Sequence, residues 1–90
     1  MKGKIEIQRG WKGWLKDLAS VSGFPQSYTG ELMIELGREV DWALKIDNLE
    51  ESIDARIDKV TVLLEAHEGN INSFDPIWPV RLQFWEWMKG

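Results

Sequence analysis

The chain has 90 residues, no cysteine, and fifteen acids against eleven basic residues, which gives a formal net charge of −4. Its length allows one compact domain with a thin core, the lack of cysteine excludes a disulfide-stapled scaffold, and the acidic balance argues against nucleic-acid binding. Because no apolar run approaches the ~18 residues of a membrane span and no apolar leader is present, we expect one domain over residues 1–90 in the cytoplasm, away from membranes.

Two elements are predicted in the first 23 residues. Lys4–Gln8 alternates polar and apolar side chains, and this period of two is typical of a strand with one buried face. After Gly10 the apolar residues recur at helical spacing, which predicts a helix over residues 11–21 that ends at Gly23. The apolar residues of this helix are Trp11, Trp14, Leu15, Leu18 and Val21.

Residues 31–46 fit two structures. As strands, they place alternating apolar residues on both sides of a Gly37–Arg38 turn, and a glycine at the first turn position suits a type II′ hairpin. As a helix, the segment also forms an apolar stripe, but Gly37 would then lie mid-helix at a cost of about 1 kcal/mol. The unbroken alternation over Val40–Ile46 favours the hairpin, and the helix remains the alternative.

A second helix is predicted over residues 49–67. Asn48 is a favourable N-cap residue, Glu51 follows three positions later as in a capping box, and Gly69 is placed to end the helix. One narrow apolar stripe recurs at steps of three and four residues. The stripe consists of Leu49, Ile53, Ile57, Val60 and Leu64.

The C-terminal segment, residues 80–88, again fits two structures. Val80, Leu82 and Phe84 alternate with polar residues, and the density of aromatic and β-branched residues favours a strand. Pro79 would instead suit the first position of a short helix. We expect the strand and keep the helix as the alternative.

In chain order these elements predict an α+β fold. It is a two-layer sandwich of ferredoxin-like β-α-β-β-α-β order, in which two helices cover one face of an antiparallel sheet. If residues 31–46 and 80–88 were helical instead, the chain would be a small helical bundle with one N-terminal strand.

The sequence offers little for catalysis or metal binding. Its single histidine, His67, lies between carboxylates at a predicted helix end, whereas zinc sites use three or four ligands and prefer His and Cys. No serine stands in a nucleophile elbow, and no glycine-rich phosphate-binding loop is present. We therefore expect a protein that is not an enzyme and that uses no cofactor and no metal.

Charge is distributed unevenly along the chain, because residues 1–16 carry a net +4 and residues 31–68 a net −7. On the predicted helix over residues 49–67, carboxylates recur along one face, many at steps of four residues or about 6 Å. They are Glu50, Asp54, Asp58, Glu65 and Glu68. Like charges at i and i+4 weaken an isolated helix by roughly 0.2–0.5 kcal/mol per pair. The face is either a solvated surface or a docking site for the lysines and arginines of a basic partner.

Six tryptophans are an unusual number for a chain of this length. On a strand over residues 80–88, Trp85 and Trp87 would share the solvent side and form an apolar patch, which is typical of a contact site. We expect the pair to anchor a partner or to form the seam of a homodimer. The alternative is that the tail folds over the core and buries both side chains.

These features favour a small acidic protein-binding module. The acidic face of the helix over residues 49–67 would dock a basic protein, as an inhibitor or a nucleic-acid mimic does, with Trp85 and Trp87 as apolar anchors. The alternative is a nucleic-acid- or ligand-binding βαββαβ domain that uses the open sheet face and the basic N-terminal segment.

Overall fold

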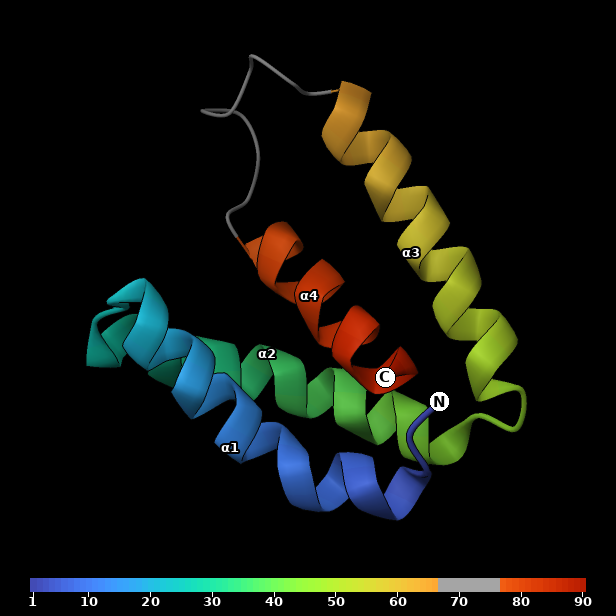
Figure 1. The fold of residues 1–90 in the computed structure, drawn as a ribbon, viewed down its shortest axis with the longest axis horizontal. Coiled ribbons are helices and arrows are strands. Elements are labelled where there is room, and N and C mark those ends of the chain that lie inside the picture. The colour runs from blue at the N-terminus through green and yellow to red at the C-terminus, as the bar shows by residue number, and fades with distance from the viewer. Residues whose placement is uncertain (67–76) are drawn as a thin grey trace. The chain divides into compact units, whose positions relative to one another are not determined.

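The structure of the protein, a computed structural model, describes residues 1–66 and 77–90. Within these two ranges it contains four α-helices and no strand (Figure 1). The helices are α1 (Lys4–Ser22), α2 (Gln26–Lys45), α3 (Leu49–Ala66) and α4 (Ile77–Lys89). The predicted α+β sandwich of ferredoxin-like order is therefore wrong. The helical-bundle alternative comes closer, but the segment it assigns to an N-terminal strand is also helical.

The helices are grouped in two compact units, each built almost entirely from consecutive residues. Residues 2–46 form one unit, in which α1 packs on α2. Residues 47–90, together with Met1, form the other, in which α3 packs on α4. The single domain expected over residues 1–90 stays a prediction.

Helix α1 includes the segment predicted as a strand. In a strand Ile5 and Ile7 would face the same side, but on the helix they point in different directions, so that Ile5 is 66% exposed and Ile7 is fully buried. The buried residues recur at steps of four and are Ile7, Trp11, Leu15 and Ala19. The predicted helix end is confirmed, because Gly23 adopts a left-handed conformation with φ 69° and donates its N–H to the carbonyl of Ala19.

Helix α2 replaces the hairpin predicted over residues 31–46. Its buried residues recur at helical steps and are Leu32, Leu36, Val40 and Ala43. Ile34, which the strand would have buried, is 62% exposed. Gly37, predicted as a turn residue, lies mid-helix opposite Trp11 of α1, and a Cβ atom added at Gly37 would lie 3.7 Å from the indole. Because 3.7 Å is an ordinary van der Waals contact, the packing does not require a glycine here, and nothing in the structure offsets its cost of about 1 kcal/mol inside a helix.

Lys4 ties α1 to the end of α2. Its Nζ donates hydrogen bonds to the carbonyl oxygens of Leu44 (3.3 Å) and Ile46 (2.6 Å). The C-terminal end of a helix carries unpaired carbonyl groups and a partial negative charge. The Lys4 ammonium therefore caps this end of α2 from the first turn of α1.

Helix α3 confirms the helix predicted over residues 49–67 as far as the structure describes it, since His67 lies outside the described residues. Its buried residues all belong to the predicted stripe and are Leu49, Ile53 and Val60. The side chain of Asn48 donates a hydrogen bond to Glu51 (3.5 Å) and accepts one from the Ser52 hydroxyl (3.3 Å). The two residues of the predicted capping box therefore meet through their side chains.

Helix α4 replaces the strand predicted over residues 80–88. Pro79 lies in its first turn, where a missing N–H is tolerated because these groups have no acceptor within the helix. The buried residues of α4 are Ile77, Val80, Phe84, Trp85 and Met88. Because Val80 and Phe84 fit both an alternating pattern and a step of four, their spacing did not separate the two structures.

Candidate functional site

The candidate site is the acidic face of α3, which we define by Glu50, Asp54, Asp58 and Glu65. Steps of four and seven residues place these carboxylates on one side of the helix. Glu50, Asp58 and Glu65 are exposed, whereas Asp54 is half-buried. Glu68, the fifth predicted member of the row, lies outside the described residues.

One position of the acidic face is occupied by a lysine of the same unit. Lys89, at the C-terminal end of α4, forms an ion pair between its Nζ and Oδ1 of Asp54. The hydrogen bond and the charge of Asp54 raise the pKa of Lys89 above its ordinary value, and the charges of Asp58 and Glu50 add to the effect. The face therefore already holds one ammonium group within the row of carboxylates.

The other three carboxylates lack such a counter-ion within the described part of the chain. Within the described residues of their own unit, 47–66 and 77–90, Glu50, Asp58 and Glu65 form no ion pair. Two lysines of the basic N-terminal segment are engaged elsewhere. Lys4 bonds to carbonyl oxygens of α2, and Lys12 lies over the ring of Trp11 at 5.7 Å from its centroid.

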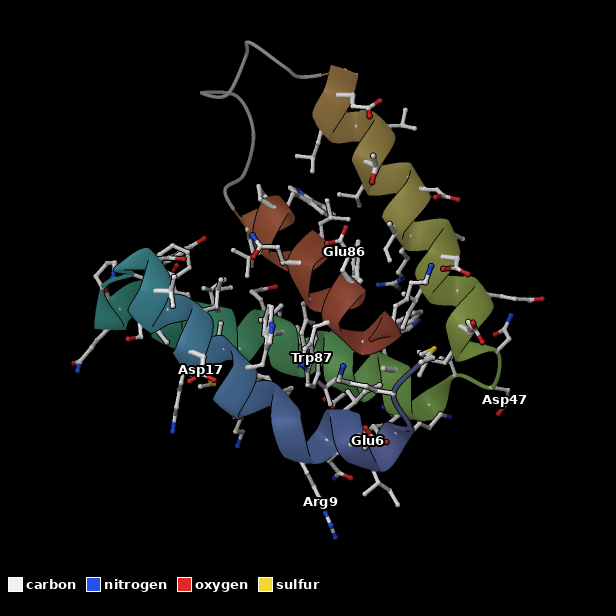
Figure 2. The ribbon with its side chains drawn as sticks, in the orientation of Figure 1. Glu6, Arg9, Asp17, Asp47, Glu86 and Trp87 are labelled. Atoms are coloured by element: carbon white, nitrogen blue, oxygen red, sulfur yellow. The ribbon has the colours of Figure 1, made fainter. Side chains whose placement is uncertain are left out.

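Trp85 and Trp87 do not share the exposed side of a strand, because their segment is helical. Trp85 is only 2% exposed, and the guanidinium of Arg56 on α3 lies over its ring at 5.7 Å from the centroid. Trp87, which is half-buried and labelled in Figure 2, stacks on Phe84 with ring centroids 5.8 Å apart and 10° between the planes. For Trp85, burial is therefore the correct alternative. A role of the pair in partner binding stays a prediction.

The α1–α2 unit holds a groove that the sequence analysis missed. The groove has a volume of about 590 Å³. Its apolar lining residues are Trp11, Met33, Ile34, Gly37, Val40 and Leu44. These residues belong to two helices, so that the sequence pattern of one segment alone could not predict the groove. The single sequence signal was Gly37, a residue without a side chain inside an apolar stripe.

Among residues 1–66 and 77–90, no group of three or more His, Cys, Asp or Glu side chains is arranged to hold a metal ion. His67, the single histidine, lies outside these ranges. Of the helices described, none combines the length and the apolar character that crossing a membrane requires.

Known proteins give no assignment for this chain. No protein-family model matches it, and neither the curated proteins nor the solved structures contain a match. The charges and contacts within the two units are therefore the basis for a functional proposal.

Proposed function

We propose that this protein is a non-enzymatic protein-binding module whose acidic face on α3 receives lysine and arginine side chains of a basic partner. One observation carries the proposal: within the described residues of the α3–α4 unit, Glu50, Asp58 and Glu65 are exposed and form no ion pair, beside an Asp54 that already binds an ammonium group. Lys89 supplies this ammonium from α4, and a partner lysine would bind the remaining carboxylates in the same way.

The energetics of the acidic face favour a partner over a purely structural role. Glu50, Asp54 and Asp58 follow one another at steps of about 6 Å, a distance at which like charges repel each other. Lys89 offsets part of this repulsion at Asp54, and a cation from outside would relieve what remains between the exposed carboxylates. Exposed ion pairs are weak, at about 0.2–1 kcal/mol each, so that three pairs amount to roughly 1.5 kcal/mol, or about tenfold in Kd.

A helical peptide with lysines at matching intervals tests the proposal. The probe is a fluorescein-labelled, alanine-based peptide with lysine at every fourth position, and its binding to the 90-residue chain is followed by fluorescence anisotropy. The test variant neutralises the three unpaired carboxylates and carries Glu50→Gln, Asp58→Asn and Glu65→Gln. The matched control neutralises three exposed carboxylates of α1 and α2 and carries Glu6→Gln, Asp17→Asn and Glu31→Gln.

Both triple variants raise the net charge by the same amount, so that only the position of the lost charges differs. We expect the test variant to weaken binding about tenfold and the control to change it less than about twofold. Binding by the unmodified protein should weaken as salt rises above about 0.1 M, because screening acts on exposed charges. Equal losses in both variants would mean that the total charge, and not the acidic face of α3, attracts the probe.

A further inference from the structure

We propose that the groove of the α1–α2 unit binds an acidic amphipathic helix of another protein, with its apolar side chains in the groove and its carboxylates along α1. This surface goes beyond the acidic face of α3, lies in the other unit and has the opposite charge. The chain would thus carry two recognition surfaces of different chemistry.

The groove has the length and the lining of a helix-binding site. From Met33 to Leu44, α2 lines the groove over a rise of about 16 Å, at 1.5 Å per residue. An amphipathic helix that inserts apolar residues at i, i+4 and i+7 spans about 11 Å, which this length accommodates. The volume of about 590 Å³ lies within the range typical of binding pockets.

The apolar part of the groove is accessible along its α2 side. Ile34 lines the groove and is 62% exposed, which is a large apolar surface in contact with water. Deeper in the groove, Trp11 lies next to Gly37 and is only 8% exposed, so that it forms the floor of the groove. A partner's apolar side chains would cover Ile34, and apolar anchors that become buried in this way often dominate helix binding.

The charges beside the groove select an acidic partner. Lys12 lines the groove, and Arg9 and Lys16 lie on the same side of α1, three residues before and four residues after it. All three side chains are exposed without an ion pair in the described ranges, and Arg9 extends from α1 into solvent in Figure 2. Of the acids of α1, Asp17 is turned about 100° away from Lys16, whereas Glu6 lies about 60° from Arg9 and about 120° from Lys12. This side of α1 is therefore predominantly basic, most of all around Lys12 and Lys16.

The opposite rim of the groove, on α2, is nearly neutral. Arg38 forms an ion pair with Glu35 at 3.3 Å, and Asp41 is exposed beside them. The two rims therefore differ in charge, so that a partner helix with one acidic flank has a preferred orientation, with that flank along α1.

The test uses the 90-residue chain and two probe peptides that differ only in charge. Each probe is a fluorescein-labelled helix of about 18 residues with leucine at i, i+4, i+7 and i+11, flanked by glutamate in one probe and by lysine in the other. The test variant, Lys12→Glu with Ile34→Glu, changes two exposed groove residues. The matched control, Val21→Glu with Lys59→Glu, makes the same chemical changes at exposed positions outside the groove.

We expect the unmodified protein to bind the glutamate probe at least about tenfold more tightly than the lysine probe, and the test variant to lose about tenfold in affinity for the glutamate probe. The control should stay within about twofold. Circular dichroism is used to check that both variants remain helical. If the test variant loses helicity, it is replaced by Lys12→Gln with Ile34→Gln.

Three results would overturn the proposal. They are equal binding of both probes, equal losses in the test and control variants, and sedimentation showing that a second copy of the chain covers the groove. The triple variant of the acidic face on α3 should bind the glutamate probe as well as the unmodified protein does. Binding at the groove and binding at the acidic face of α3 are thus tested separately, so that one proposal can be refuted while the other stands.

Discussion

Replacing Lys4 by methionine removes the ammonium group that caps α2 and keeps most of the alkyl chain. In the folded protein this ammonium donates one short hydrogen bond to the Ile46 carbonyl (2.6 Å) and one longer bond to the Leu44 carbonyl (3.3 Å). Both bonds are partly buried and link residues about forty positions apart. Their loss therefore loosens the contact between the beginning of α1 and the end of α2.

The expected loss of stability follows from these two bonds. A hydrogen bond with a charged donor contributes about 1.5–3 kcal/mol, and a cation at a helix C-terminus typically adds 0.3–1 kcal/mol. Because the Leu44 bond is long, we count the Ile46 bond and the helix-end term, and expect a loss of about 2–3 kcal/mol in the free energy of unfolding. At about 4–8 °C per kcal/mol for a chain of this size, Tm should fall by roughly 8–24 °C.

Thermal and urea unfolding followed by circular dichroism measure this loss, with Lys16→Met as the control. Lys16 is exposed on the same helix and forms no ion pair or hydrogen bond within the described residues. The control should shift the free energy of unfolding by less than about 0.5 kcal/mol. If Lys4→Met and Lys16→Met lower stability equally, the ammonium of Lys4 does not stabilise the end of α2 and our reasoning is wrong.

Three further predictions concern single positions. Gly13→Ala should raise the free energy of unfolding by about 0.5–1 kcal/mol in a urea titration, because an added Cβ meets nothing within 4 Å; a loss of stability would contradict this. Trp85→Ala should lower it by about 3–5 kcal/mol, since the indole is 2% exposed; a change below about 1 kcal/mol would show that the ring is not part of the core. In an NMR titration Lys89 should show a raised pKa that Asp54→Asn lowers towards its ordinary value, because Asp54 is the largest cause of the shift. A raised pKa favours the protonated lysine in the folded state, so that this stabilisation is present below about pH 10.4 and disappears as pH rises through the folded pKa.

The helices with one dominant apolar stripe could be predicted from the sequence. The helix over residues 49–67 was recognised because its apolar residues recur only at steps of three and four, and no alternation competes with this pattern. The helix over residues 11–21 was recognised for the same reason, together with its end at Gly23. At the margin of this stripe the prediction failed, because Val21 is 88% exposed.

The three segments that were wrongly predicted as strands have a common explanation. In Lys4–Gln8, in residues 31–46 and in residues 80–88, apolar residues on two sides of a helix happen to alternate in the sequence. Exposed Ile5 and Ile34 complete the apparent strand patterns although neither contributes to the core. Exposed isoleucines thus mimic a period of two, and only the packing between helices shows which apolar residues are buried.

The candidate site was predictable only where it depends on a single helix. The row of carboxylates on α3 follows from spacing alone, and Glu50, Asp58 and Glu65 are exposed as expected. Lys89 could not be assigned to Asp54, because this contact depends on how α4 packs on α3. The groove of the α1–α2 unit was missed for the same reason.

The succession of the two units along the chain has a consequence for synthesis. All contacts between α1 and α2, including the Lys4 cap, involve residues up to Ile46, so that none of them waits for the second half of the protein. Helical pairs with local contacts form within about a millisecond, whereas a ribosome adds only about 5–20 residues per second. The first pair of helices can therefore assemble as soon as it leaves the exit tunnel, without contacts from the second pair.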